Sequence, residues 1–205
     1  MIAVVDYGVG NLFSLKSSFA VLGAQICVTG DKEIISRAEK IVLPGVGAFG
    51  DAAKKLRAEG LDKVLISEAK KGKPILGICL GMQLLFDKSF EYGVHDGLGL
   101  IGGSVRPIAD LCKSKVKIPH MGWNSLDFGE NKHPIFKYIN DGDFVYFVHS
   151  FCAVDCKDSL IAATEYGGER ITAAAANKNV IGCQFHPEKS GEIGLKILKA
   201  FCEME

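Results

Sequence analysis

The stretch that most constrains this chain runs from Pro74 to Gln83, where an apolar segment meets a cysteine between two glycines. Its sequence is Pro-Ile-Leu-Gly-Ile-Cys-Leu-Gly-Met-Gln, with Cys79 at the centre of a Gly-x-Cys-x-Gly spacing. This pattern predicts a buried strand, a sharp turn with Cys79 at its apex and a helix that begins at once, which is the thiol form of a nucleophile elbow. The glycines let backbone and substrate approach a strained turn, and a helix N-terminus favours the thiolate. Because most free cysteines are buried and inert, a structural role for Cys79 stays open at this point.

Short apolar runs alternate with helical patterns through the first half of the chain. The sequence predicts a helix cap at Asp31, strands at 2–5, 25–29, 41–43 and 74–78, and helices at 12–22 and 52–71, the second broken at Gly60. Alternation of this kind predicts an α/β fold with an open, mostly parallel, flavodoxin-like sheet flanked by helices.

The second half reads as more β-rich. Strands are predicted at 144–148, 160–164, 172–176 and 180–183, short strands and turns at 97–108, and a closing helix at 191–201. The alternating Lys113, Lys115 and Lys117 indicate a solvent-facing strand. Since the chain shows no repeat and no long linker, residues 1–205 are expected to form a single domain.

Three glycine-rich turns follow predicted strands, at Asp6–Asn11, Pro44–Gly47 and Gly77–Gly81. The carboxyl ends of parallel strands share one edge of a sheet, and open sheets bind ligands there. The first turn lacks the third glycine of a dinucleotide fingerprint, because Phe13 stands at that position, and the chain has no Walker A pattern. No nucleotide or other cofactor is therefore expected.

Charge and cysteine content exclude several other classes. Lys+Arg and Asp+Glu are both 24, which argues against a general binder of nucleic acid or acidic membranes. The first residues are strand-like and no apolar run reaches membrane-spanning length, so we expect a cytoplasmic protein without a signal peptide. The seven cysteines are irregularly spaced; they indicate reduced thiols, and no metal site is expected.

A thiol nucleophile needs a base and an orienting group, and the segment His186-Pro187-Glu188 offers both. In an extended backbone, positions i and i+2 lie on the same side, so Glu188 could hold the imidazole of His186 while that ring faces Cys79. A packed histidine without a catalytic role is the alternative. Acyl transfer also needs donors for an oxyanion, which the Leu80 N–H and the Pro44–Gly47 loop could supply; a plain strand-to-helix turn is the alternative for this loop.

Together, Pro44–Gly47, Gly77–Gln83 and His186–Glu188 resemble the class I (triad) glutamine amidotransferases in order and spacing across nearly the whole chain. The resemblance implies a single type-1 amidotransferase domain in which Cys79 attacks the side-chain amide of glutamine and forms a glutamyl thioester. It implies His186 as the acid and base and Glu188 as its orienting group. The family's oxyanion donors fall on Val46, Gly47 and Leu80, and its substrate-binding positions fall on Gly45, Gln83, His149 and Ser150.

Further stretches resemble, within this family, the glutaminase subunits that form a heterodimer with a separate (β/α)8-barrel cyclase of histidine biosynthesis. They are Asp6–Leu12, Pro119–Asn124, Tyr146–Ser150 and His186–Ser190. The resemblance implies that ammonia crosses into the cyclase, and that the interface includes Asn11, Trp123, Tyr146 and Lys189. For Trp123, the alternative is a partly buried core aromatic.

Three rival interpretations stay open. A paralogous subunit that supplies ammonia for cell-surface sugar amidation would carry the same triad. Cysteine-elbow proteins of the protease and deglycase type also carry a reactive thiol, but they lack the His-Pro-Glu ending. A regulatory subunit could keep the fold and bind a partner without catalysis, although the intact Cys79, His186 and Glu188 argue against it.

Overall fold

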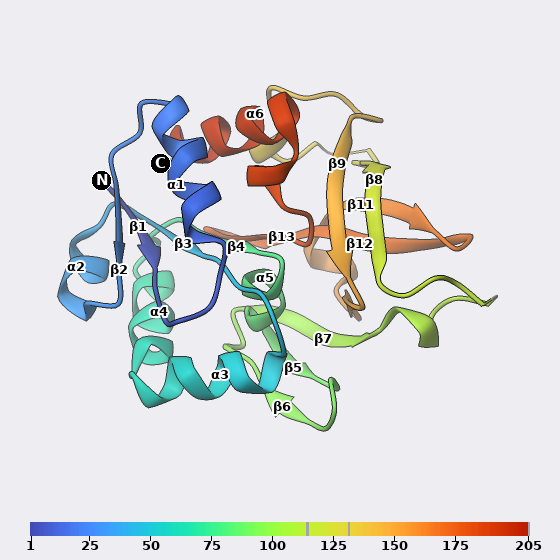
Figure 1. Cartoon of the computed structure of the whole chain (residues 1–205), viewed down its shortest axis with the longest axis horizontal. Coiled ribbons are helices and arrows are strands. Elements are labelled where there is room, and N and C mark those ends of the chain that lie inside the picture. The colour runs from blue at the N-terminus through green and yellow to red at the C-terminus, as the bar shows by residue number, and fades with distance from the viewer. Residues whose placement is uncertain (114, 131, 205) are drawn as a thin grey trace.

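The computed structural model describes residues 1–113, 115–130 and 132–204. At its centre lies a seven-stranded sheet with the order β11-β12-β13-β4-β3-β1-β2 (Figure 1). The strands are β1 (Ile2–Val5), β2 (Ile26–Thr29), β3 (Lys40–Leu43), β4 (Ile75–Ile78), β11 (Leu160–Tyr166), β12 (Glu169–Asn177) and β13 (Val180–Cys183). Five strands, from β2 to β13, pair in parallel, and β12 and β11 add an antiparallel edge. The predicted α/β fold with a mostly parallel sheet is confirmed.

Helices cover both faces of this sheet (Figure 1). They are α1 (Leu12–Val21), α2 (Lys32–Arg37), α3 (Phe49–Ala58), α4 (Leu61–Lys70), α5 (Leu80–Leu84) and α6 (Gly191–Cys202). In β1, Ile2 and Val4 pack into the layer that contains α1 and α6, whereas Ala3 and Val5 pack into the layer of α2, α3 and α4. Because successive side chains of a strand point to opposite faces, burial of both faces requires an unbroken apolar run, and the sequence has one here.

Two smaller sheets lie beside the central one. One has the order β10-β7-β5-β6, with β5 (Phe86–Ser89), β6 (His95–Asp96), β7 (Ile101–Pro107) and β10 (Phe151–Val154). The other pairs β8 (His120–Ser125) with β9 (Phe144–His149) in an antiparallel ribbon. Of these strands, β7 and β9 fall in segments predicted as strands, whereas β5, β6, β8 and β10 were not predicted. Short 3-10 turns lie at η1 (Ile108–Asp110), η2 (Pro134–Phe136), η3 (Lys157–Ser159) and η4 (Pro187–Lys189).

The helix starts follow local and remote signals. Asp31 caps α2 as predicted, because its carboxylate accepts from the N–H groups of Glu33 at 2.8 Å and Ile34 at 3.1 Å. Gly60, at φ 66°, separates α3 from α4. Helix α3 begins at Phe49, three positions before the predicted start at 52, because the carboxylate of the distant Glu91 accepts from the Phe49 N–H at 2.6 Å.

Two sequence interpretations differ from the structure in the loops. The expected solvent-facing strand at Lys113, Lys115 and Lys117 is wrong: these residues lie in irregular chain, with residue 114 outside the described residues. Strand β8 was not anticipated, since a sequence with Gly122 in its middle carries no strong alternation. The strand forms because it pairs with β9, with Trp123 opposite Tyr146, and not because of its local sequence pattern.

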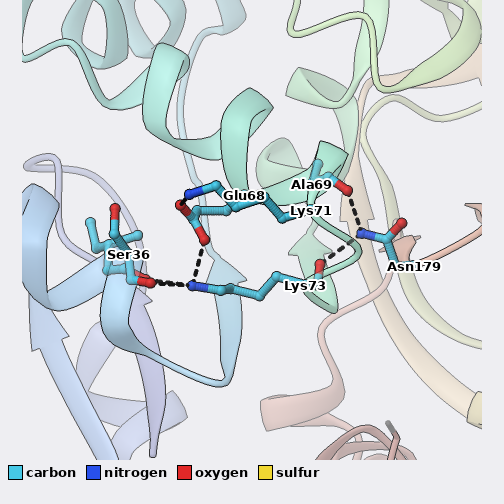
Figure 2. Close-up of polar contacts among 7 residues, drawn as sticks. Ser36, Glu68, Ala69, Lys71, Lys73 and Asn179 are labelled. Atoms are coloured by element: carbon cyan, nitrogen blue, oxygen red, sulfur yellow. Dashed lines mark hydrogen bonds and ion pairs between the residues drawn. The ribbon is translucent and has the colours of Figure 1, made fainter.

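The amino-terminal edge of the sheet is closed by a polar network, which we call the amino-edge network (Figure 2). The carboxylate of Glu68, at the end of α4, forms ion pairs with Lys71 and Lys73, both at 2.6 Å. Lys73 also donates to the carbonyl oxygen of Ser36 at 2.6 Å, and Asn179 donates to the carbonyl oxygen of Lys73 at 2.7 Å. The network ties α2, α4 and the segments before β4 and β13 together. Among the described residues, no helix combines the length and the apolar character needed to span a membrane.

Candidate active site

The predicted elbow forms at the carboxyl end of β4. Cys79 lies between β4 and α5 with φ 54° and ψ −111°, a strained conformation for any residue other than glycine. Its backbone is held from both sides: the Cys79 N–H donates to Cys183 O at 2.8 Å, and the Gln83 N–H donates to Cys79 O at 3.2 Å. A side chain at Gly81 would overlap the Leu43 carbonyl oxygen, so this position requires glycine.

His186 reaches Cys79, and Glu188 reaches His186, because β13 pairs in parallel with β4, with Cys183 opposite Ile78. The Nδ1 of His186 lies 2.8 Å from Glu188 Oε1, and the two side chains are buried. Burial lowers the pKa of His186, but hydrogen bonds and charges from Cys79 and Glu188 outweigh burial and raise this pKa to about 9. The imidazole is therefore a strong proton acceptor for the thiol of Cys79.

These groups open into a cavity of about 380 Å³, a size suited to a small ligand. Most of the predicted oxyanion and substrate residues line it: Val46, Gly47, Leu80, Gln83, His149 and Ser150, together with Cys79 and His186. Five further residues that were not predicted to bind substrate also line the cavity: Glu91, Tyr92, Pro119, Val148 and Phe151. Lys189, which was predicted only at the interface, lines it as well.

The Pro44–Gly47 loop lies against the elbow. The Tyr7 hydroxyl donates to the carbonyl oxygen of Pro44 at 2.8 Å, and burial raises the pKa of this tyrosine. Gly47 has φ 97°, which favours glycine. Gly45, predicted to bind substrate, does not line the cavity; a Cβ there would lie 2.8 Å from both the Gly81 nitrogen and the Tyr7 hydroxyl oxygen.

Two glutamines connect the cavity wall to the thiol. The Gln83 amide nitrogen donates to Phe151 O and to Gln184 Oε1, both at 3.0 Å, so Gln83 can offer a ligand only its carbonyl oxygen. The Gln184 amide nitrogen in turn donates to Cys79 Sγ at 3.8 Å. Gln184 was not singled out from the sequence, although a polar residue between the apolar Cys183 and Phe185 is the signal that could have identified it.

Glu91 is the other residue that sequence reasoning missed. It follows β5, its carboxylate accepts from the Phe49 N–H, and it is 9% exposed at the cavity. The sequence around it, with several glycines and no strong periodicity, gave no signal for this role. Its carboxylate is the one acidic side chain among the described residues that line this cavity.

The four predicted interface residues lie around the carboxyl edge of the sheet. Trp123 and Tyr146 are cross-strand neighbours whose ring centroids lie 6.0 Å apart at 67°, and Lys189 Nζ lies 6.0 Å from the centroid of Tyr146. Trp123 is 53% exposed, which argues against the core interpretation. Asn11 accepts from the Ser14 N–H at 3.4 Å and caps α1, which packs against η4.

Metal ligation has little geometric basis in the part of the chain that the structure describes. Across residues 1–113, 115–130 and 132–204, no group of three His, Cys, Asp or Glu side chains converges to hold a metal ion.

The family model for class-I glutamine amidotransferases matches residues 3–204. Among curated proteins, the HisH subunit of imidazole glycerol phosphate synthase from Lactococcus lactis subsp. lactis (strain IL1403) is 50% identical over 202 residues, which cover 98% of both chains. The HisH subunit from Caldanaerobacter subterraneus subsp. tengcongensis is 50% identical over 205 residues, which cover 100% of this chain and 98% of that protein.

Solved structures agree on the fold. A structure described as PurLQS from Thermotoga maritima has a TM-score of 0.75 at 23% identity and covers 98% of this chain and 96% of that chain. A crystal structure of a glutamine amidotransferase has a TM-score of 0.74 at 16% identity, with coverage of 98% and 99%. The long full-length matches favour the HisH interpretation over a sugar-amidating paralogue. The chain therefore belongs to the class-I glutamine amidotransferases, and within them to the HisH subunits of imidazole glycerol phosphate synthase.

Proposed function

We propose that residues 1–205 act as one glutaminase domain that passes ammonia to a (β/α)8-barrel cyclase, its heterodimer partner in imidazole glycerol phosphate synthase. The cyclase would convert the ribulosyl-carboxamide intermediate PRFAR into imidazole glycerol phosphate and AICAR in histidine biosynthesis. The observation that carries the glutaminase proposal is the strained Cys79 beside a buried His186–Glu188 pair in one cavity. All seven cysteines are free thiols, which supports a cytoplasmic location.

In the proposed chemistry, His186 has accepted the thiol proton before the attack, and Cys79 Sγ bonds as the thiolate to the side-chain amide carbon of glutamine. The resulting oxyanion accepts hydrogen bonds from the backbone N–H of Leu80 and from that of Val46 or Gly47. As the intermediate collapses, the C–N bond breaks and His186 returns the proton to nitrogen, so that ammonia leaves and a glutamyl thioester remains. Water then attacks the thioester with His186 as base, and glutamate and the free thiol are formed.

Charges in the cavity suggest how glutamine is held. The carboxylate of Glu91 suits the α-ammonium group, and the carbonyl oxygen of Gln83 is a second acceptor. The His149–Ser150 segment lies along the same wall and would face the α-carboxylate. Gly45 would act indirectly, because its lack of a side chain lets the oxyanion loop lie against the elbow.

A tight connection to the cyclase fits the chemistry of ammonia, which is mostly protonated and non-nucleophilic once it reaches neutral water. The exposed Trp123, with Tyr146 and Lys189 beside it, offers an aromatic and cationic surface of the kind enriched at interfaces. Asn11, at the start of α1, would belong to the same interface.

The thiol's role is tested by Cys79→Ala in the complex with the cyclase. Synthesis of imidazole glycerol phosphate from glutamine should fall to background, whereas synthesis from added ammonium salts should persist at the wild-type rate. Loss of both activities would mean that Cys79 is structural. No covalent labelling of Cys79 by a glutamine-like electrophile, with the cyclase present, would favour a subunit that only binds its partner.

Partner control of the site follows from the freedom of the Gly45-Val46-Gly47 loop. If its N–H donor turns toward the oxyanion only when the liganded cyclase binds, the isolated chain should be a poor glutaminase. Glutamate release with and without the liganded cyclase measures this effect. Equal rates would contradict the gating role of the loop.

A further inference from the structure

A chain of four hydrogen bonds runs through the cavity wall between the carbonyl oxygens of Phe151 and Glu165. His149 Nδ1 lies 2.8 Å from Phe151 O, and His149 Nε2 lies 2.9 Å from His120 Nδ1. His120 Nε2 lies 2.9 Å from Asn124 Oδ1, and Asn124 Nδ2 donates to Glu165 O at 3.0 Å. We call His149, His120 and Asn124 the histidine chain.

The four hydrogen bonds of the histidine chain need four protons, but the neutral side chains supply three. The two end groups are carbonyl oxygens, which only accept. Each neutral imidazole carries one N–H, and the Asn124 carboxamide places N–H groups on one side and its oxygen on the other. Turning this carboxamide over moves the gap to another contact but adds no proton. In a neutral chain, one of the contacts of 3.0 Å or less must therefore bring two lone pairs together.

We propose that His120 and His149 hold one extra proton between them, which completes the histidine chain and gives the wall of the glutaminase cavity one positive charge, shared by the two rings. The pair is then a buried imidazolium and imidazole. His120 becomes a positioning residue, which acts on the substrate through His149 without touching it. The effect on glutamine rests on the proposed glutaminase function, whereas the shared proton itself does not.

The surroundings of His120 favour the cation. Its ring is stacked between Tyr166, with centroids 4.0 Å apart at 23°, and Phe147, with centroids 4.9 Å apart at 20°. Aromatic faces attract a cation through their quadrupole, and Arg, Lys and imidazolium use the same interaction. The opposing β9 strand places His149 directly across from His120, so the two rings are held at hydrogen-bond distance by the ribbon itself.

Burial acts against the proton. It lowers the pKa of His120, and it lowers the pKa of His149, taken as a separate ring, to about 3. For the pair as a unit we infer the opposite direction, because release of the proton would leave two lone pairs facing each other at a buried contact 2.9 Å long. A buried polar group without a hydrogen bond raises the free energy of the folded state, because no water replaces the missing partner. This cost opposes the cost of burying the charge.

No carboxylate of the described residues neutralises the charge of the pair, which therefore depends on the aromatic rings and the hydrogen bonds of the histidine chain. Neither ring forms an ion pair with a carboxylate of the described residues. From β11, Glu165 contributes only its backbone carbonyl while its side chain is exposed, and Tyr166 donates its hydroxyl to the Lys117 carbonyl oxygen. From the cavity side, protonated His186 repels a charge on His149, and Glu188 partly offsets this repulsion through its contact with His186.

The charge would act where glutamine is proposed to bind. His149 lines the cavity next to Ser150, so the positive charge that it shares with His120 attracts the α-carboxylate of the substrate. Both nitrogens of His149 are already occupied within the histidine chain. The attraction is therefore electrostatic, and it should appear mainly in KM, because the amide that reacts lies at the other end of the substrate.

The shared proton can be counted directly in the full chain by NMR of ¹⁵N-labelled histidine side chains. At pH 7 we expect three protonated nitrogens among the four of His120 and His149, with the third lost only under alkaline conditions. His133, whose Nδ1 accepts from the Ile135 N–H, is the internal control and should show one protonated nitrogen. Two protonated nitrogens in the pair at pH 7 would overturn the proposal, whether or not the chain is a glutaminase.

The effect on substrate is tested in the complex with the cyclase by His120→Gln. In the wild type, loss of the shared proton should make KM for glutamine increase with pH. In His120→Gln we expect KM at pH 7 to rise about five-fold with little change in kcat, and this increase with pH to disappear. His133→Gln is the matched control and should leave both constants unchanged. A wild-type KM and pH profile in His120→Gln would overturn the role of the charge.

If His120→Gln does not fold or does not form the complex with the cyclase, the variant Asn124→Asp provides a second test. A carboxylate at this position stabilises the proton on His120, so the rise of KM should move to higher pH, and the third protonated nitrogen should persist to higher pH in the NMR titration. An unchanged pH profile together with an unchanged NMR titration would overturn the proposal.

Discussion

The two edges of the central sheet are made by the same strands, but polar side chains are fully paired at one edge and are left strained or unpaired at the other. At the amino edge, the buried carboxylate of Glu68 is paired with two lysines, and Asn179 donates to two carbonyl oxygens, those of Ala69 at 2.9 Å and Lys73 at 2.7 Å (Figure 2). At the carboxyl edge, Cys79 keeps a strained backbone, and Glu188 Oε2 is buried without a hydrogen-bond partner among the described residues.

This difference shows where the fold uses its polar side chains for stability and where it keeps them available for chemistry. A strained residue costs about 1–3 kcal/mol and persists only when its surroundings hold it. The amino-edge network holds the same strands from their other end, so that the nucleophile turn rests on a rigid frame. Substitutions at the carboxyl edge should therefore change activity, and substitutions at the amino edge should change stability.

The largest expected effect is on catalysis, from Glu188→Gln. Without the carboxylate beside Nδ1, the ring of His186 is no longer fixed in the tautomer that accepts the thiol proton, and kcat for glutamine hydrolysis should fall about 1000-fold. Glutamate release by the complex with the cyclase measures the change. Glu192→Gln, at an exposed ion pair with Lys196 in α6, is the control and should retain full activity. A loss smaller than tenfold would mean that Glu188 does not orient the base.

Next in size is the effect of Glu68→Gln on stability. The variant leaves Lys73, which is 12% exposed, without its carboxylate, and breaking a buried pair in this way should lower the free energy of unfolding by about 3 kcal/mol. Urea denaturation of the free chain measures the loss. Glu33→Gln, at an ion pair whose two side chains are both 80% exposed, should change this free energy by less than about 0.5 kcal/mol. Equal losses in the two variants would remove the distinction between the edges.

The third prediction concerns the pH dependence of stability. The pKa of His186 is raised from 6.5 to about 9 in the folded chain, so between these values the folded state binds a proton that the unfolded state has released. This stabilisation is complete below pH 6.5 and is lost as pH rises through 9, which should lower the free energy of unfolding by about 2 kcal/mol. Denaturation of wild type and His186→Gln at both pH values isolates the contribution. A pH dependence of the same size in the variant would assign it to other groups.

The smallest expected effect comes from Tyr7→Phe. In the wild type, Tyr7 connects the end of β1 to the oxyanion loop through its hydroxyl group. Loss of the hydroxyl bond to Pro44 O should cost about 1 kcal/mol and slow glutamine hydrolysis about five-fold, because the loop is held less firmly against the elbow. Tyr138→Phe removes an exposed hydroxyl bond to Glu203 and serves as the control, with no change in activity. An unaltered rate in Tyr7→Phe would show that other contacts hold the loop.

Local sequence was a good guide wherever the relevant contacts are local. The apolar run before Cys79, the glycines around it and the cap at Asp31 each act on their own segment, so strand, turn and helix could be predicted. Contacts between distant segments could not be. Glu91 reaches across to the start of α3, and β8 becomes a strand only by pairing with β9. Neither segment has a hydrophobic periodicity from which its contact partner could be predicted.

By itself, the sequence determined the parallel sheet, the nucleophile turn at Cys79 and the His186–Glu188 pair two residues apart, because backbone sterics and short-range spacing dictate them. Only the tertiary structure decided that β13 lies beside β4, that Gln184 donates to Cys79 Sγ and Glu91 shares its cavity, and that His120 faces His149. The physical reason is that proton positions and charges in a buried site depend on which groups meet there. That meeting is fixed by strand order and register rather than by any single stretch of chain.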